Sequence, residues 1–169
     1  MNQTVQDAIN EQINAELTAS YAYLAMSAYC EQQSFVGCAR WLRAQSQEEY
    51  GHGMKLFDFM LARNGRIELK AMGEPPATFS SVGDVFERAY QQEQEVSRQI
   101  DQLYDLAFRE KAFAATVELE WFLMEQVEEE KTAREIVRKL HLIKNDPASL
   151  LDLDRELGAR SASITTSSA

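Results

Sequence analysis

Helix-breaking residues are scarce in this sequence, which has only 7 glycines and 3 prolines among its 169 residues. Hydrophobic residues make up 45% of the chain and charged residues 26%, which argues against a disordered protein and fits a globular helical one. The length corresponds to a single domain that is large enough to bury most of its unfolded surface in one core. We therefore expect one all-α domain.

Long apolar runs and an excess of positive charge are also absent. The N-terminal stretch MNQTVQDAINEQINAELTAS has neither the basic start nor the continuous apolar segment of a signal peptide, and no run reaches the length of a membrane span. The formal net charge is −10, which argues against nucleic acid and anionic membranes as partners and favours cations as ligands. We expect a soluble protein of the cytoplasm or of an organelle lumen.

Cysteine is nearly absent from the chain. The two cysteines, Cys30 and Cys38, do not have the spacing of a metal site. We predict that both are reduced and partly buried rather than joined in a disulfide.

Apolar periodicity predicts four long helices. Their expected ranges are Thr4–Gln32, Phe35–Arg63, Val82–Phe108 and Ala112–Leu142. Short turns join the first helix to the second and the third to the fourth, so each pair should form an antiparallel hairpin. The segment between the second and third helices, about 17 residues, can span roughly 55 Å, whereas a helix of about 28 residues is roughly 42 Å long. This segment can therefore cross the whole length of a four-helix bundle.

A short fifth helix should follow the bundle. Asp146 predicts a helix cap, Pro147 the first helical position, and Gly158 the helix end. Residues 159–169 are then a flexible tail, and the domain covers residues 1–158. The predicted fold class is all-α, a four-helix bundle with one long crossover and a short C-terminal helix.

Polar residues interrupt the apolar stripe of each long helix near its middle. They are Glu16 on the first helix, Glu49 and His52 on the second, Glu93 on the third, and Gln126 and Glu129 on the fourth. The separations Glu16–Glu49 and Glu93–Gln126 are both 33 residues, and the separations Glu16–His52 and Glu93–Glu129 are both 36. In antiparallel hairpins, this repeat should bring all six side chains to one level inside the bundle.

Two glycines, Gly51 and Gly53, flank His52 within the second predicted helix. Each internal glycine costs about 1 kcal/mol relative to alanine in a helix. Either these glycines let a neighbouring helix or subunit approach closely, or the helix simply tolerates them.

Several carboxylates in one buried layer require compensating positive charge. No lysine or arginine falls on the apolar stripes at this height, so two metal ions bridged by carboxylates are the simplest way to neutralise the layer. Oxygen donors with one imidazole suit iron or manganese better than a closed structural zinc site, although Zn²⁺ could still bind, and calcium is disfavoured. The alternative from another class is a helical bundle whose acidic layer serves only structure or partner recognition.

The residues of this layer resemble the ferritins, specifically their non-haem prokaryotic branch. The resemblance rests on Glu16, on EEYGH (48–52), on YQQE ending at Glu93 and on EQVEEE (125–130), and it covers nearly the whole chain. It implies a ferroxidase centre in which Glu16, Glu49 and His52 surround one iron. Glu49 would bridge to a second iron held by Glu93 and Glu129, with Gln126 hydrogen-bonding near the oxygen site.

The same resemblance implies roles for residues around this centre. Tyr23 looks like the ferritin tyrosine that hydrogen-bonds a ligand or supplies an electron, and Trp121 is a candidate for a second oxidisable group. A third iron site would use Glu48, Glu125 and Glu128 together with Glu129. The alternative reading of these last glutamates is a solvated helix face.

Haem is not expected. In bacterioferritins the counterpart of Glu129 is a histidine and the counterpart of Tyr50 is a haem-ligating methionine, and this sequence has neither.

The resemblance further implies iron storage in a hollow cage of twenty-four subunits, with Fe²⁺ oxidised by O₂ or peroxide and ferric mineral deposited in the cavity. The fifth helix would line the four-fold axes with Leu150, Leu151, Leu153 and Leu157. Glu118 and Glu120 are candidates for the route by which Fe²⁺ enters.

A diiron oxidase of the rubrerythrin or manganese-catalase kind is the nearest alternative. The chain lacks the cysteine cluster typical of rubrerythrins, and the fifth helix favours a cage-forming protein over a rubrerythrin or a manganese catalase.

Overall fold

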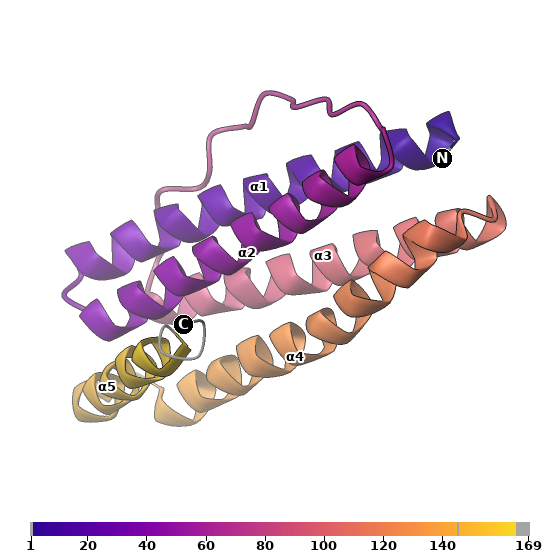
Figure 1. The fold of residues 1–169 in the computed structure, drawn as a ribbon. Helices are drawn as coiled ribbons and strands as arrows, with labels where there is room; N and C mark the ends of the chain where they lie inside the picture. The colour runs from indigo at the N-terminus through magenta and orange to yellow at the C-terminus, as the bar shows by residue number, and fades with distance from the viewer. Residues whose placement is uncertain (1, 145, 165–169) are drawn as a thin grey trace.

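The computed structural model describes residues 2–144 and 146–164, and these residues form five α-helices (Figure 1). Their bounds are α1 (Gln3–Gln32), α2 (Val36–Ala62), α3 (Val82–Arg109), α4 (Phe113–Ile143) and α5 (Pro147–Ile164). The all-α prediction is confirmed, and the four long helices begin and end within one residue of their predicted bounds. None of the helices in the described part of the chain is long and apolar enough to cross a membrane.

The helix ends follow from local sequence. The side chains of Asn2 and Ser81 accept hydrogen bonds from the backbone N–H groups of Val5 and Asp84, and so cap α1 and α3. Ser34 and Lys111 adopt left-handed backbone conformations, with φ of 66° and 54°, in the two short turns. These turns reverse the chain within a few residues, so α1 with α2 and α3 with α4 form antiparallel hairpins (Figure 1).

The long crossover between α2 and α3 is held along α1 by two asparagines. Asn10 donates to the carbonyl of Arg66 and accepts from the N–H of Glu68, at 2.9 and 3.0 Å. Asn14, one helical turn later, donates to the carbonyl of Glu68 and accepts from the N–H of Lys70, at 2.9 and 2.7 Å. Each amide thus satisfies two peptide groups of the crossover, which returns the chain to the end where α3 begins (Figure 1).

α5 packs on the N-terminus of α2, where the two backbones come very close. A Cβ atom added to Gly37 would lie 1.8 Å from the carbonyl oxygen of Asp154, and one added to Gly158 would lie 3.0 Å from the Cα of Gly37. The Asp154 carboxylate accepts a hydrogen bond of 2.8 Å from the N–H of Cys38, and Phe35, the N-cap residue of α2, provides no side-chain cap of its own. Asp154 therefore caps α2 from another helix.

The prediction that the fifth helix ends at Gly158 is wrong, because α5 continues to Ile164. Gly158 occupies a point of close contact between two helices, and a single glycine inside a helix costs only about 1 kcal/mol. Residues 159–164 of the predicted tail thus belong to α5, and residues 165–169 lie outside the described residues.

The buried apolar side chains form two clusters, one towards each end of the bundle. The cluster near α5 includes Tyr23, Trp41, Phe86, Ile136 and Leu157, and the other includes Ile9, Ile13, Leu56, Ile100 and Leu119. Cys30 and Cys38 are unpaired in the first cluster, and burial raises the pKa of the Cys30 thiol to about 12. The prediction of free cysteines is thus confirmed, but both are fully buried rather than partly buried. The polar layer lies between the two clusters.

Candidate metal centre

Four glutamates and one histidine from all four bundle helices meet between the two apolar clusters. Glu16, Glu49 and Glu93 are 0% exposed, His52 is 6% exposed, and Glu129 is 9% exposed. Helical geometry brings Glu49 and His52, three residues apart on α2, to the same face one turn apart. The structure therefore brings together five of the six residues that the sequence repeat selected, and the sixth, Gln126, lies against them.

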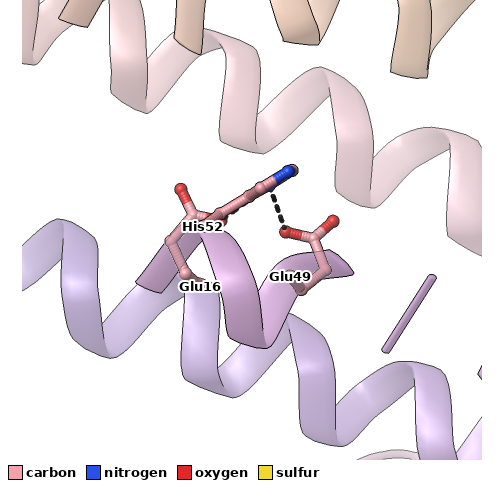
Figure 2. A group of neighbouring side chains, drawn as sticks. All are labelled: Glu16, Glu49 and His52. Atoms are coloured by element: carbon pink, nitrogen blue, oxygen red, sulfur yellow. Dashed lines mark ion pairs between the residues drawn. The ribbon is translucent and has the colours of Figure 1, made fainter. Parts of the chain in front are cut away.

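The first group of side chains consists of Glu16, Glu49 and His52 (Figure 2). The Nδ1 atom of His52 lies 3.4 Å from Oε2 of Glu49 and 4.0 Å from Oε2 of Glu16. One ligand atom from each of the three residues lies within 4.8 Å of the others. Two carboxylates and one imidazole at these distances can surround a single metal ion.

Several carboxylate oxygens of this layer have no hydrogen-bond donor. Both oxygens of Glu49 and Oε2 of Glu16 are fully buried without a partner in the described residues. Among those residues, no lysine or arginine forms an ion pair with any of the four buried glutamates, and His52 is the only basic group that lies against them. Buried carboxylate oxygens without donors are costly, so the layer suits a ligand that carries positive charge.

The same burial shifts the protonation of the layer. The pKa of Glu49 is raised by burial and then by the charges of Glu93 and Glu16, and burial also raises the pKa of Glu93. Burial and the charge of Glu93 raise the pKa of Glu129 to about 8, whereas burial lowers the pKa of His52. The metal-free centre therefore retains protons near neutral pH, and metal binding should release them.

This proton retention predicts that the free energy of unfolding of the metal-free protein falls as the pH rises from 6.5 to 8. The pKa of Glu129 is about 8 in the folded protein against an ordinary value of 4.5, so the folded state binds one more proton across this interval. One such group lowers the free energy of unfolding by roughly 1 to 2 kcal/mol over the interval. His52 acts in the opposite sense only below its ordinary value of 6.5, because its pKa is lowered in the folded protein.

Denaturant titrations of the metal-free protein at pH 6.5 and pH 8 measure this difference. Glu129→Gln should reduce it, whereas Glu128→Gln, one residue away on the exposed surface, should leave it unchanged. A metal-free protein that becomes more stable between pH 6.5 and 8 would contradict the proton retention.

Tyr23 and Gln126 both donate to Glu93. The Tyr23 hydroxyl donates a short hydrogen bond to Oε1 of Glu93, and the Gln126 amide donates to Oε2 of the same carboxylate at 3.3 Å. Burial and the neighbouring carboxylates, Glu93 first, raise the pKa of Tyr23 well above its ordinary value, so its phenol keeps its proton. The two residues thus lie against the layer, where the sequence placed them.

A second group joins His52 with two glutamates of α4. One ligand atom from each of His52, Glu125 and Glu129 lies within 4.8 Å of the others. Glu48 lies close by, since burial and the charge of Glu125 raise its pKa. Glu128 is different, because its side chain is 67% exposed and contacts Lys131 at 3.4 Å. The structure groups Glu125 and Glu129 with His52, which the sequence had not placed in this group, and the charge of Glu125 also acts on Glu48.

Trp121 connects His52 to the surface. Its ring lies edge-on to the imidazole of His52, with centroids 5.4 Å apart, and the residue is 41% exposed. Lys55 lies 5.0 Å from the centroid of the Trp121 ring and 3.0 Å from the carboxylate of Glu118. Glu118, a candidate for the Fe²⁺ route, is therefore paired with a lysine in this structure.

The two glycines beside His52 differ in their surroundings. A Cβ atom on Gly53 would lie 3.4 Å from the Cβ of Glu16 and 3.5 Å from the side chain of Leu17, which are ordinary van der Waals contacts with α1. A Cβ atom on Gly51 would meet nothing within 4 Å. Packing within the described chain therefore requires a glycine at neither position.

Sequence reasoning missed two glutamines that touch the layer. Gln12 donates to Oε1 of Glu16 at 2.8 Å, and Gln45 donates to Oε2 of Glu129 at 3.0 Å. Gln12 lies one turn before Glu16 on α1, a spacing that could have revealed it. Gln45 lies on a different helix from Glu129, so only the fold shows this contact.

Comparison with known proteins agrees with this architecture. The family model of the ferritin-like domain matches residues 6–143, which span the four-helix bundle and its buried layer. The chain belongs to the ferritin family.

Relatives of this ferritin come from bacteria and archaea. The bacterial non-heme ferritin of Staphylococcus aureus is 37% identical over 160 residues, covering 95% of this chain and 96% of its own, and that of Staphylococcus saprophyticus is 38% identical over 161 residues with the same coverage. The open pore ferritin of the hyperthermophilic archaeon Archaeoglobus fulgidus superimposes with a TM-score of 0.92 at 43% identity, covering 94% of this chain and 98% of that one. A closed form engineered from the same archaeal ferritin gives the same TM-score at 44% identity, covering 94% and 96%.

Proposed function

We propose that this ferritin binds two Fe²⁺ ions per subunit in the buried layer, oxidises them with O₂ or peroxide, and stores the product as a ferric mineral. The observation that carries the proposal is the set of buried carboxylate oxygens of Glu16 and Glu49 that have neither a hydrogen-bond donor nor a cationic side chain beside them. Two divalent cations would supply the missing charge, and iron fits a donor set of carboxylates and one imidazole.

Each residue has a part in this proposal. Glu16, His52 and Glu49 hold the first Fe²⁺, and Glu93 and Glu129 hold the second. Glu49 contacts both ions, because it is the carboxylate with two unpartnered oxygens. The protein holds the ions in an acidic site of low dielectric constant, and iron supplies the redox chemistry.

Tyr23 and Trp121 lie where they can take part in electron transfer. Tyr23 is fully buried and hydrogen-bonded to Glu93, so it positions this ligand and can supply an electron to an oxidant at the centre. Trp121 packs on His52 and reaches the surface, which makes it a candidate for a second oxidisable group.

We further propose a third iron site on the face shared by α2 and α4. Glu48, Glu125 and Glu129 would hold the ion, with His52 close enough to contribute. Glu128 belongs to this site only if its exposed side chain turns away from Lys131. Sharing Glu129 with the diiron centre would give oxidised iron a short path out of it.

Storage requires a cage, which the family resemblance gives as twenty-four subunits. Of the four α5 leucines expected at the four-fold axes, Leu151 is 50% exposed and available for assembly, whereas Leu153 and Leu157 are buried in the core of the single chain, which corrects that expectation. Haem is not part of the proposal, since Tyr50 stands at the position where haem would need a methionine. A diiron oxidase that stores no mineral and a bundle without redox turnover are the competing functions.

The assembly state separates storage from these alternatives. On size-exclusion chromatography with light scattering, we expect the purified protein at about twenty-four times the 19.2 kDa mass of one chain. After aerobic incubation with excess Fe²⁺, the same peak should retain far more iron than two ions per subunit. A stable monomer or dimer would count against storage, and so would a peak that retains no more than two iron ions per subunit. Neither result would decide whether the centre oxidises iron, which has its own test.

A further inference from the structure

Three of the four buried carboxylates accept a hydrogen bond from a buried glutamine amide. The pairs are Gln12 with Oε1 of Glu16 at 2.8 Å, Gln45 with Oε2 of Glu129 at 3.0 Å, and Gln126 with Oε2 of Glu93 at 3.3 Å. All three glutamines are at most 5% exposed. A glutamine NH₂ group donates without bringing charge, so it orients a carboxylate and still leaves the layer in need of cations.

Glu49 is the exception. Neither of its oxygens has a hydrogen-bond partner, and no glutamine donates to it. Glu16 has one oxygen held by Gln12 and the other, Oε2, without a partner on the side of His52. Glu16 and Glu129 thus each have one oxygen held by an amide, whereas Glu49 has none held and Glu93 accepts at both oxygens, from Tyr23 and Gln126.

We propose that Gln12 and Gln45 are positioning residues that set the coordination mode of their carboxylates. Gln12 holds one oxygen of Glu16 and Gln45 holds one oxygen of Glu129, so each of these glutamates gives a metal ion a single oxygen. Glu49, with no such amide, keeps both oxygens for bridging. This inference rests on the proposed diiron function and assigns roles to two residues that do not touch the metal themselves.

The two glutamines act on different metal positions. Glu16, the partner of Gln12, shares the first position with His52, and Glu129, the partner of Gln45, shares the second with Glu93. Loss of a hydrogen bond to a metal-ligating group typically lowers metal affinity by about 10- to 100-fold. Each substitution should therefore weaken one position and leave the other unchanged.

Anaerobic Co²⁺ titration of the full-length protein, followed by visible absorption, tests the positioning role of the two glutamines without iron oxidation. The variants are Gln12→Met and Gln45→Met, which keep length and remove the donor. The matched control is Gln102→Met on α3, where the side chain is exposed. We expect two Co²⁺ per subunit at the diiron positions in the wild type and in the control, beside any Co²⁺ at the proposed third site. In each glutamine variant, one of the two binding steps should weaken by about 10- to 100-fold. The absorption spectrum of the weakened position should also change, because the freed carboxylate oxygen becomes available as a further ligand.

The outcomes separate this inference from the proposed function. A wild type that binds fewer than two Co²⁺ per subunit contradicts the diiron centre itself. If the wild type shows two binding steps and the variants match it in affinity and spectrum, the positioning role alone is overturned. Equal weakening of both steps in either variant also overturns it, since a general disturbance of the bundle would spread over both positions. The variants lie on different helices, so if circular dichroism shows that one does not fold, the other decides the question.

Discussion

Replacing Glu49 with alanine is expected to lower the initial rate of aerobic Fe²⁺ oxidation by at least about 100-fold, since the proposed bridge between two ions would supply several kcal/mol of charge stabilisation. Glu49 is 0% exposed and both of its oxygens lack a partner, so no other contact in the described chain accounts for this buried charge. Removing it takes a ligand from both iron positions at once. Stopped-flow absorbance in the near ultraviolet measures the rate.

The stability of the Glu49→Ala protein should change in the opposite direction from its activity. Without metal, the carboxylate is a buried group whose pKa is raised by burial and by Glu93, so its removal relieves a cost near neutral pH. The matched control is Glu95→Ala on α3, two residues from Glu93 but exposed and paired with Arg98, and it should oxidise iron at the wild-type rate. A Glu49→Ala variant that oxidises Fe²⁺ as fast as the Glu95→Ala variant would exclude Glu49 as the bridge.

Replacing Gly37 with alanine is expected to destabilise the protein by about 3 kcal/mol or more, although alanine is the better helix former. The new Cβ would lie 1.8 Å from the Asp154 carbonyl oxygen and 2.7 Å from its carbon, and both atoms belong to the backbone of α5. α5 would have to move away. This movement would break the cap of α2, worth about 1 kcal/mol, and expose Leu153 and Leu157, whose full burial is worth about 1.5 to 3 kcal/mol each.

Thermal melting of the metal-free protein measures this loss, which corresponds to a decrease in melting temperature of roughly 6 to 12 °C. Gly51→Ala is the matched control, because it is the same substitution in the same helix at a site where a Cβ meets nothing within 4 Å. It should raise stability by up to about 1 kcal/mol. If Gly37→Ala melts at or above the wild-type temperature, the close packing of α5 on α2 is wrong.

Much of the fold could be predicted from the sequence, because its determinants are local. Apolar periodicity and the tight turns at Ser34 and Lys111 place the four long helices within one residue of their observed ends. Gly158 shows where this reasoning fails. A glycine near the end of a helical pattern suggests a stop, yet here it lies against Gly37 of a helix more than a hundred residues earlier in the chain. Contacts of this kind depend on the packing of α5 and leave no local signal.

The candidate site, like the fold, could be predicted from the sequence only in part. Separations of 33 and 36 residues from Glu16 to Glu49 and His52 recur from Glu93 to Gln126 and Glu129. They are a property of helix length, so the residues that would bind metal are visible in the sequence. The role of Gln45 is not visible, because it depends on which side chain of α4 faces it across the bundle. Helical periodicity does separate Glu129 from Glu128 in the sequence, and the structure agrees, because Glu129 is 9% exposed and the side chain of Glu128 is 67% exposed.

The proposed diiron oxidation centre is tested most directly by adding Fe²⁺ without oxygen and then admitting O₂. We predict that the fast rise in near-ultraviolet absorbance after mixing with O₂ grows with added Fe²⁺ and saturates at two Fe²⁺ per subunit, one for each proposed position. Oxygen uptake recorded on the same samples gives the number of electrons that each O₂ accepts. A protein that shows no fast absorbance change, or one whose fast phase does not saturate near two Fe²⁺ per subunit, would contradict a diiron oxidation centre in this bundle.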